Sequence, residues 1–352
     1  MPLHHRWKLD RKIWEPLQRF ESRDYLARHY EKQHGRSLSA QRAHEIGSCF
    51  TQGREYFTSA STASDAVKPL LLYYGVASLG RGVTLLLDSR KREESLTPAH
   101  GLGAVEWAKT LHAGISNVLK LKVQCSKGTF PEFVNAVGNG QSYTWLDKDR
   151  RAGGFRNDFG EIRFLSDGSL ISLGDLLSRE KDLAGEYEIA NDGWGNTDIG
   201  SVVALESCIR VFFIPAAGRD MGAAITSYGF PETAKASLQA SPVYPQLRTL
   251  CVEIPASGED RKKVIPMAVD QDKNIGWLIR PFSNGDNIID IHRMFIESFM
   301  LGMLSRYFPS KWMSLLRSEK GDISRSVILA AIARIETEFP KLLRNHLPSH
   351  QS

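Results

Sequence analysis

One histidine and a few cations stand out as side chains that could bind or transform a ligand. His100 precedes a glycine and follows a charged stretch at residues 90–94. A histidine beside glycine in a loop titrates near neutral pH and leaves room for a ligand to approach. The sequence therefore predicts His100 as an acid–base residue, and the alternative is a loop histidine that bonds to backbone.

Three cations lie in segments that are otherwise apolar. Lys68 stands at the expected start of a helix, where a positive charge opposes the helix dipole, so a bound anion or a distant carboxylate should stabilise it. Arg81 lies inside an apolar run, where an arginine usually has a carboxylate partner. Arg306 is followed by Tyr307, a pair that can bind phosphate or stack on a base. If these cations converge on His100, they would form a pocket for a phosphate-bearing ligand.

A pattern found in one class of ribonuclease occurs near the N-terminus, but it is too unspecific to identify a ribonuclease. One class of all-helical ribonuclease uses an arginine followed a few residues later by a histidine. Arg23 with His29 and Arg28 with His34 both satisfy that spacing. Two overlapping matches in one basic segment are weak support for a defence-associated ribonuclease.

Several motifs of known chemistry are missing from the sequence. It contains no GxxxxGK[ST] phosphate loop, no HExxH zinc motif and no GxSxG nucleophile elbow. The cysteines lie far apart, and the acid pairs at residues 147/149 and 186/188 lack a third ligand at metal-binding spacing. We therefore predict no metal site and no cofactor.

Composition and charge indicate a globular chain in a reducing compartment. The net charge of +5 is spread along 352 residues, so there is no strong nucleic-acid signature. Widely spaced cysteines are expected to be reduced, and the N-terminus has no apolar signal segment. The apolar run at residues 70–87 contains Arg81 and three glycines, which favours a buried helix over a membrane span. We expect a cytoplasmic protein that does not contact a membrane.

The pattern of apolar residues divides the chain into three regions. Residues 1–128 and 286–352 carry apolar stripes at helical spacing, with Gly35 and Ser39 at positions typical of a helix end and a helix start. Residues 129–285 contain short apolar runs separated by turn residues, which are typical of strands. We predict an α+β fold whose helical N- and C-terminal regions pack together, with a β-rich, mostly antiparallel middle region.

The middle region contains several candidate strands. They lie at residues 161–165, 201–215, 247–254, 263–269 and 275–280. A hairpin turn is expected at Asp167-Gly168, and a short helix is expected at residues 172–178.

Three stretches resemble the YaaC-like protein family. They are QGREYF at residues 52–57 leading to VKPLLLYYG at 67–75, AHGL at 99–102, and MLSRYFPSKW at 303–312. They occur in the expected order and extend over most of the chain. The resemblance implies a bacterial, cytoplasmic setting and supplies no mechanism, because the family is largely without assigned chemistry.

Two classes of function remain open at this point. A large apolar core without a recognisable catalytic constellation favours a binding or scaffold protein, whose partner is a phosphate-bearing ligand or another protein. The alternative is an enzyme that acts on a nucleotide or RNA, with His100 as acid–base residue and Lys68, Arg81 and Arg306 as phosphate contacts. The second reading requires those side chains to meet in one pocket.

Overall fold

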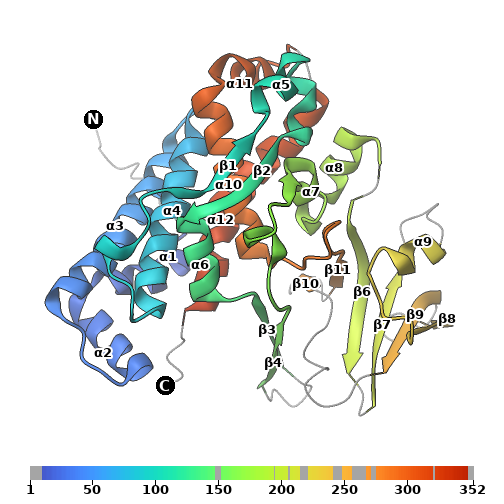
Figure 1. The fold of residues 1–352 in the computed structure, drawn as a ribbon, viewed down its shortest axis with the longest axis horizontal. Helices are drawn as coiled ribbons and strands as arrows, with labels where there is room; N and C mark the ends of the chain where they lie inside the picture. The colour runs from blue at the N-terminus through green and yellow to red at the C-terminus, as the bar shows by residue number, and fades with distance from the viewer. Residues whose placement is uncertain are drawn as a thin grey trace. The chain divides into compact units, whose positions relative to one another are not determined.

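The computed structural model describes residues 10–146, 152–193, 195–204, 207–214, 221–240, 248–255, 267–270, 275–319 and 322–347. The chain forms two compact units (Figure 1). Unit 1 comprises Met1–Gly138, Phe164–Leu176 and Asp290–Ser352, and unit 2 comprises Asn139–Arg163 and Leu177–Ile289. Helices dominate unit 1 and antiparallel strands dominate unit 2, so the predicted α+β class is confirmed.

Unit 1 is built from long helices and one small antiparallel sheet of order β1-β2-β5. The strands are β1 (His100–Val105), β2 (Lys122–Gly128) and β5 (Leu170–Ser172). The helices are α1 (Arg11–Gln18), α2 (Arg23–His34), α3 (Ala40–Thr62), α4 (Lys68–Leu87), α5 (Trp107–His112), α6 (Thr129–Val137), α7 (Leu173–Leu177), α10 (Asp290–Tyr307), α11 (Pro309–Leu316) and α12 (Arg325–His346). The short 3-10 turns of unit 1 are η1 (Arg19–Glu21), η2 (Glu93–Ser95), η3 (Ile115–Lys120) and η7 (Asp322–Ser324). Another turn, η4 (Arg163–Leu165), lies where the chain passes from unit 2 into unit 1, and η5 (Lys181–Leu183) belongs to unit 2.

The core of unit 1 surrounds α4, which packs against α3, α6 and α10. Tyr73, Val76 and Leu79 on this helix are fully buried. Within the described residues, α4 is long and apolar enough to span a membrane, but 67% of its most apolar window is buried inside the protein. An apolar core helix passes the same test, so the buried helix predicted from the sequence is confirmed.

Local signals set the ends of the neighbouring helices. Gly35 ends α2 with a φ of +64°, a conformation that costs glycine little. The Ser39 side chain accepts a hydrogen bond from the backbone N–H of Arg42 and so begins α3. Both assignments were predicted from the sequence and are confirmed.

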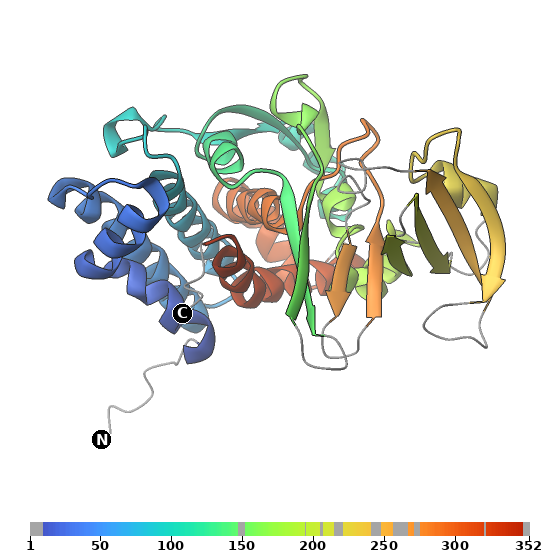
Figure 2. The same ribbon diagram turned by 90° about the horizontal axis from the view of Figure 1, so that it is seen from below.

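The first and last helices of the chain lie side by side in unit 1 (Figures 1 and 2). α12 contacts α1, α3 and α4. Trp312 on α11 donates its indole N–H to the carbonyl of Asp65 at 3.1 Å, and Lys68 on α4 bonds Glu336 on α12 at 2.9 Å. The predicted packing of the two helical ends of the chain is therefore confirmed.

Unit 2 contains a six-stranded antiparallel sheet of order β10-β11-β6-β7-β9-β8 and a two-stranded ribbon, β3 with β4. One face of the sheet buries Val211, Phe213 and Leu250 against Tyr228 and α9 (Met221–Thr226). The remaining elements are β3 (Gly140–Leu146), β4 (Ala152–Asp158), α8 (Ala184–Asn191), β6 (Thr197–Ala204), β7 (Cys208–Ile214), β8 (Lys235–Ala240), β9 (Arg248–Pro255), β10 (Met267–Asp270) and β11 (Ile275–Ile279).

The middle of the chain departs from the sequence prediction in two places. Residues 201–215 were predicted as one strand, but they contain parts of two strands, β6 and β7, which pair antiparallel. Residues 161–165 do not form a strand: η4 occupies Arg163–Leu165, and the apolar Ile162 and Phe164 are buried without pairing in a sheet. Asp167-Gly168 therefore forms a turn, with Gly168 at a φ of +74°, but it does not join two strands of a hairpin. The short helix expected after it is present as α7, and residues 263–266 of another predicted strand lie outside the described residues.

Candidate functional site

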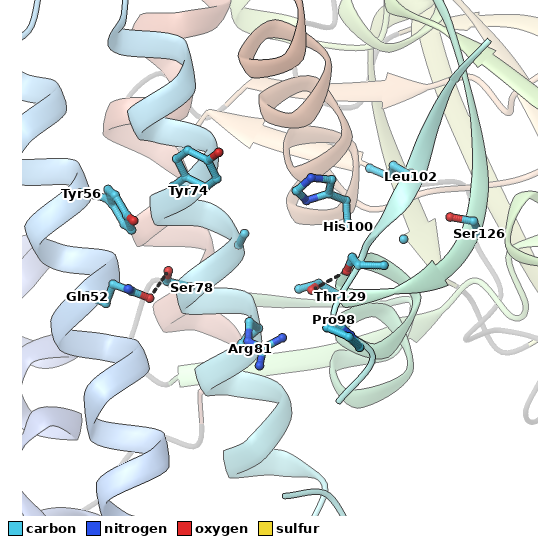
Figure 3. A pocket seen from close by; sticks show the side chains of 13 residues that line it. Gln52, Tyr56, Tyr74, Ser78, Arg81, Pro98, His100, Leu102, Ser126 and Thr129 are labelled. Atoms are coloured by element: carbon cyan, nitrogen blue, oxygen red, sulfur yellow. Dashed lines mark hydrogen bonds between the residues drawn. The ribbon is translucent and has the colours of Figure 1, made fainter. Parts of the chain in front are cut away.

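Unit 1 contains a cavity of about 480 Å³ between α3, α4 and the segment that leads into β1 (Figure 3). Its size is within the range of small-molecule sites. Among the residues that the structure describes, no carboxylate lines it. Its main polar and aromatic side chains are Gln52 and Tyr56 from α3, Tyr74, Ser78 and Arg81 from α4, and His100 from β1.

Helical spacing places five of these side chains on the two helix faces that meet at the cavity. Gln52 and Tyr56 are four residues apart on α3, and on α4 Ser78 lies four residues after Tyr74 and three before Arg81. Residues three and four apart share one face of a helix. Ser78 donates a hydrogen bond to the Gln52 side-chain oxygen at 2.9 Å, which leaves the Gln52 amide N–H groups as donors.

A bulge at the start of β1 brings His100 to the cavity. The register with β2 shifts between His100 and Leu102, and Gly101 adopts a φ of +81°. A Cβ atom at Gly101 would lie 2.4 Å from Pro131, so a larger residue does not fit there. Bulges commonly redirect a side chain toward a site. Thr129 holds Ala99, the residue before His100, in place. The backbone N–H and the hydroxyl of Thr129 both donate to the Ala99 carbonyl, at 2.9 and 3.0 Å.

Tyr73 determines which nitrogen of His100 carries the proton. The Tyr73 hydroxyl lies 2.6 Å from His100 Nδ1, and the Tyr73 side chain is fully buried. Burial raises the pKa of Tyr73, so the phenol keeps its proton. Because a buried donor needs an acceptor, and Nδ1 is the partner that Tyr73 has among the described residues, we assign the phenol as donor and Nδ1 as acceptor. The ring proton of His100 is then on Nε2.

His100 is uncharged at neutral pH. Burial lowers the pKa of His100 below its ordinary value of 6.5, and the positive charge of Arg306 lowers it further. A neutral ring with its proton on Nε2 can donate one hydrogen bond from that nitrogen. The half-buried His100 therefore offers its Nε2–H as a hydrogen-bond donor to a ligand in the cavity.

Arg81 on α4 differs from Arg54 on α3 in having no counter-ion among the described residues. Arg54 bonds Glu21 at 2.7 Å and Glu55 at 2.7 Å, and both lie outside the cavity lining. Arg81 makes no ion pair or hydrogen bond with any described residue, although it is half-buried. Its guanidinium thus lines a cavity with no carboxylate among its described lining residues, and an anion would complement it there.

Arg306 does not line the cavity itself, but it contacts Tyr74, which does. Its guanidinium donates to the Tyr74 hydroxyl at 2.6 Å and lies 5.0 Å from the centre of the Tyr307 ring. Tyr307 is 61% exposed and does not line the cavity. Of this predicted pair, Arg306 is thus adjacent to the site and Tyr307 is outside it.

Lys68 is far from the other predicted residues. It lies thirteen positions before Arg81 on α4, about 20 Å along the helix axis. Its ammonium bonds Glu336, which is the distant carboxylate that the sequence left open as one explanation. The structure therefore brings His100 and Arg81 together with Arg306 nearby, and it separates Lys68 from them.

The histidines of the ribonuclease pattern have structural contacts. His29 is 3% exposed and packs edge-on against Phe20, with ring centres 5.0 Å apart. His34 donates from Nε2 to the carbonyl of Leu86 at 2.9 Å, near the end of α4. Neither histidine lines the cavity that contains His100.

Cysteines and acids give no indication of a metal or redox site in the described residues. No group of three potential ligands is close enough to hold a metal ion there. Burial raises the pKa values of Cys49 and Cys125 to about 11, which makes both thiols poor nucleophiles. The acid pair at 186/188 lies on α8 in unit 2, and the pair at 147/149 is outside the described residues.

Sequence reasoning missed most of the lining of the cavity. Gln52, Tyr56, Tyr74 and Ser78 were not predicted as site residues. Their signal is faint: polar or aromatic side chains recur at i and i+4 on helices whose other face is apolar. The same pattern describes any solvated helix face, so only the structure shows that two such faces meet.

Comparison with known proteins gives one match. The model of a family described as YaaC-like Protein matches residues 16–347, which is nearly the whole chain. No curated protein and no solved structure matches significantly.

Proposed function

Since this chain belongs to the YaaC-like protein family, whose name indicates no chemistry, we propose a function from the site itself: the cavity binds a small anionic, phosphate-bearing ligand. The observation that carries this proposal is the half-buried Arg81 guanidinium, which has no counter-ion among the described residues and lines a cavity whose described lining contains no carboxylate. Arginine presents a planar fork of donors that matches the oxygens of a phosphate.

Two further groups support an anionic ligand. His100 offers an Nε2 proton from the β1 side, and the Gln52 amide offers donors from the α3 side. With Arg81 they form a set of donors from three elements around one space. A phosphate is acceptor-rich, so such a set complements it.

The His100–Tyr73 pair favours binding over acid–base catalysis. A general base at this position would need a lone pair on Nε2, but the hydrogen bond from Tyr73 keeps the Nε2 proton in place. The catalytic role predicted for His100 is therefore a separate hypothesis. Turnover of a phosphorylated compound by the wild type, abolished in His100→Ala with folding intact, would establish it.

The proposed setting is a bacterial cytoplasm. The resemblance to the family supports it, and so do the four free cysteines, of which Cys49, Cys208 and Cys251 are buried. Free thiols persist in reducing compartments. A second function, as a scaffold for a protein partner, has no specific contact in its favour.

A thermal-shift screen tests the proposed function. The wild type, Arg81→Gln and Arg90→Gln are heated with inorganic pyrophosphate and a panel of phosphorylated metabolites. A compound that binds the folded state raises the melting temperature by mass action. Arg90→Gln removes the same charge from an exposed site away from the cavity.

We expect at least one phosphorylated compound to stabilise the wild type and Arg90→Gln but not Arg81→Gln. Equal shifts in all three proteins would show that the anion binds elsewhere. No shift with any compound would remove the support for an anion-binding site.

A further inference from the structure

We propose that the ligand of this cavity is a free nucleoside monophosphate, with its base on the Tyr56–Tyr74 pair and its phosphate on Arg81. The inference rests on the proposed function, because it names the class of anion that the same site takes. It adds a second recognition element, the two tyrosines, which an anion alone would not use.

The cavity has two chemically distinct ends (Figure 3). The tyrosines lie at one end and Arg81 at the other, with the hydrogen-bonded Gln52 and Ser78 between them. Tyr74 and Arg81 are seven positions apart on α4, which corresponds to about 10 Å along the helix axis. A ligand that uses both ends must carry a flat apolar group and an anion separated by a polar linker, which is the build of a nucleotide.

The tyrosine end is an aromatic wall that is fixed in place. The rings of Tyr56 and Tyr74 lie 5.6 Å apart at 32°, and the Tyr73 ring lies 5.7 Å from that of Tyr74. Arg306 holds the Tyr74 hydroxyl at 2.6 Å and adds a positive charge beside the rings. Aromatic side chains next to arginine are a common platform for nucleic-acid bases.

The volume of the cavity also argues for more than an inorganic anion. A water molecule takes about 30 Å³ in the liquid, and a phosphate ion is the size of only a few waters. A cavity of about 480 Å³ leaves most of its space, including the tyrosine end, unused by phosphate alone. A base and a ribose would fill that space.

The charge of the cavity favours a single phosphate over an RNA backbone. Proteins that follow a nucleic-acid strand use a row of lysines and arginines, because each phosphate needs its own cation. Among the described residues, the lining has one arginine and no lysine. One guanidinium suits a mononucleotide.

Calorimetric titration of the full chain tests this inference with matched ligands. The probes are the four ribonucleoside 5′-monophosphates, ribose 5-phosphate, which keeps the phosphate and lacks the base, and a 5′-phosphorylated RNA trinucleotide. The proteins are the wild type, Tyr56→Leu, Tyr56→Phe and Arg81→Gln. Tyr56→Phe keeps the ring, and the affinity of the two Tyr56 variants for ribose 5-phosphate reports whether their site is still folded.

We expect at least one monophosphate to bind the wild type about 5- to 150-fold more tightly than ribose 5-phosphate, the contribution of one stacked base. Tyr56→Leu should abolish that preference and leave the affinity for ribose 5-phosphate unchanged, whereas Tyr56→Phe should keep both. Arg81→Gln should weaken all the phosphorylated ligands.

The inference and the proposed function fail in different ways. If ribose 5-phosphate binds as tightly as every monophosphate, or if Tyr56→Leu retains the preference, the nucleotide assignment is wrong while anion binding stands. Tighter binding of the trinucleotide than of the mononucleotides would also overturn it. If neither ribose 5-phosphate nor any monophosphate binds, the proposed function itself is wrong.

Discussion

Two histidines of unit 1 show how the surroundings of a side chain separate structural from ligand-binding roles. His292 on α10 is fully buried, lies edge-on to Phe133, and donates from Nε2 to the Gly138 carbonyl at 2.8 Å. His100 is half-buried and lines the cavity, and Tyr73 occupies its Nδ1, so its Nε2 is free to donate to a ligand. The first ring has no route to a ligand, and the second has one.

The burial of His292 predicts how the stability of the protein changes in acid. Burial lowers its pKa from 6.5 to about 3, so the unfolded chain takes up a proton at a higher pH than the folded chain does. The contribution of His292 to stability is therefore complete above pH 6.5 and is lost as the pH falls from 6.5 toward 3. We expect it to shrink by about 2 kcal/mol between pH 7 and pH 5.

Urea unfolding of the wild type and of His292→Gln at pH 7 and pH 5 measures this contribution. Gln does not titrate and can still donate to the Gly138 carbonyl, so the variant should lose less stability over that interval. Other groups titrate in both proteins and cancel in the difference. Equal losses in the two proteins would contradict the assignment.

At the level of elements, the cavity depends on the close approach of α3 and α4. A Cβ atom added at Gly75 would lie 2.6 Å from the ring of Phe57, and one at Gly53 would lie 2.6 Å from the side chain of Leu79. Such distances are shorter than any normal contact, so only glycine allows this packing. The same two helices carry the tyrosines and Arg81, and their spacing therefore sets the width of the site.

Gly75→Ala should consequently destabilise the protein by about 1–3 kcal/mol, because the Phe57 ring has to move. Gly185→Ala is the control: Gly185 lies on α8 and nothing is within 4 Å of its added Cβ. There the better helix propensity of alanine should raise stability by up to about 1 kcal/mol. Denaturant unfolding compares the two, and a Gly75→Ala variant as stable as Gly185→Ala would show that the helices separate easily.

The elements also show which parts of the fold a sequence can predict. α4 was predicted because a long apolar run with a charge and glycines has few alternatives. β1 was missed, since HGLGAV at His100–Val105 contains two glycines and little strand propensity. Residues 161–165 alternate like a strand, but Ile162 and Phe164 are buried without a pairing partner. Periodicity reports burial, and it does not report whether a neighbouring strand exists.

At the scale of the whole chain, unit 1 joins residues that are far apart in sequence. Tyr73 meets His100 across 27 positions, and Tyr74 meets Arg306 across 232. The sequence suggested His100, Arg81 and Arg306 by type, but these contacts depend on how α10 packs on α4 and on β1. For the same reason it could not predict that Lys68 pairs with Glu336 instead of joining the site.

The Lys68–Glu336 pair, which joins α4 to α12, is expected to contribute to the stability of the protein. Both side chains are mostly buried, at 17% and 19% exposed, so Glu336→Gln leaves an ammonium without its counter-ion. We expect a loss of about 1–2 kcal/mol in the free energy of unfolding, between the values for exposed and buried pairs. Ligand affinity should not change, because the pair is outside the cavity.

Glu338→Gln provides the matched control on the same helix. Glu338 bonds Lys341 at 2.7 Å with side chains that are 35% and 41% exposed, so its loss should have a smaller effect. Urea unfolding of both variants decides the matter. Equal losses would mean that the Lys68 ion pair contributes no more than a surface pair. Weaker ligand binding in Glu336→Gln would show that Lys68 contributes to ligand binding.

Crystals of the protein soaked in tungstate, a heavy analogue of phosphate, show directly whether an anion binds at Arg81. We expect an anomalous peak within hydrogen-bond distance of the Arg81 guanidinium and of His100 Nε2. A strong peak elsewhere on the molecule, with the cavity between α3, α4 and β1 empty, would contradict it.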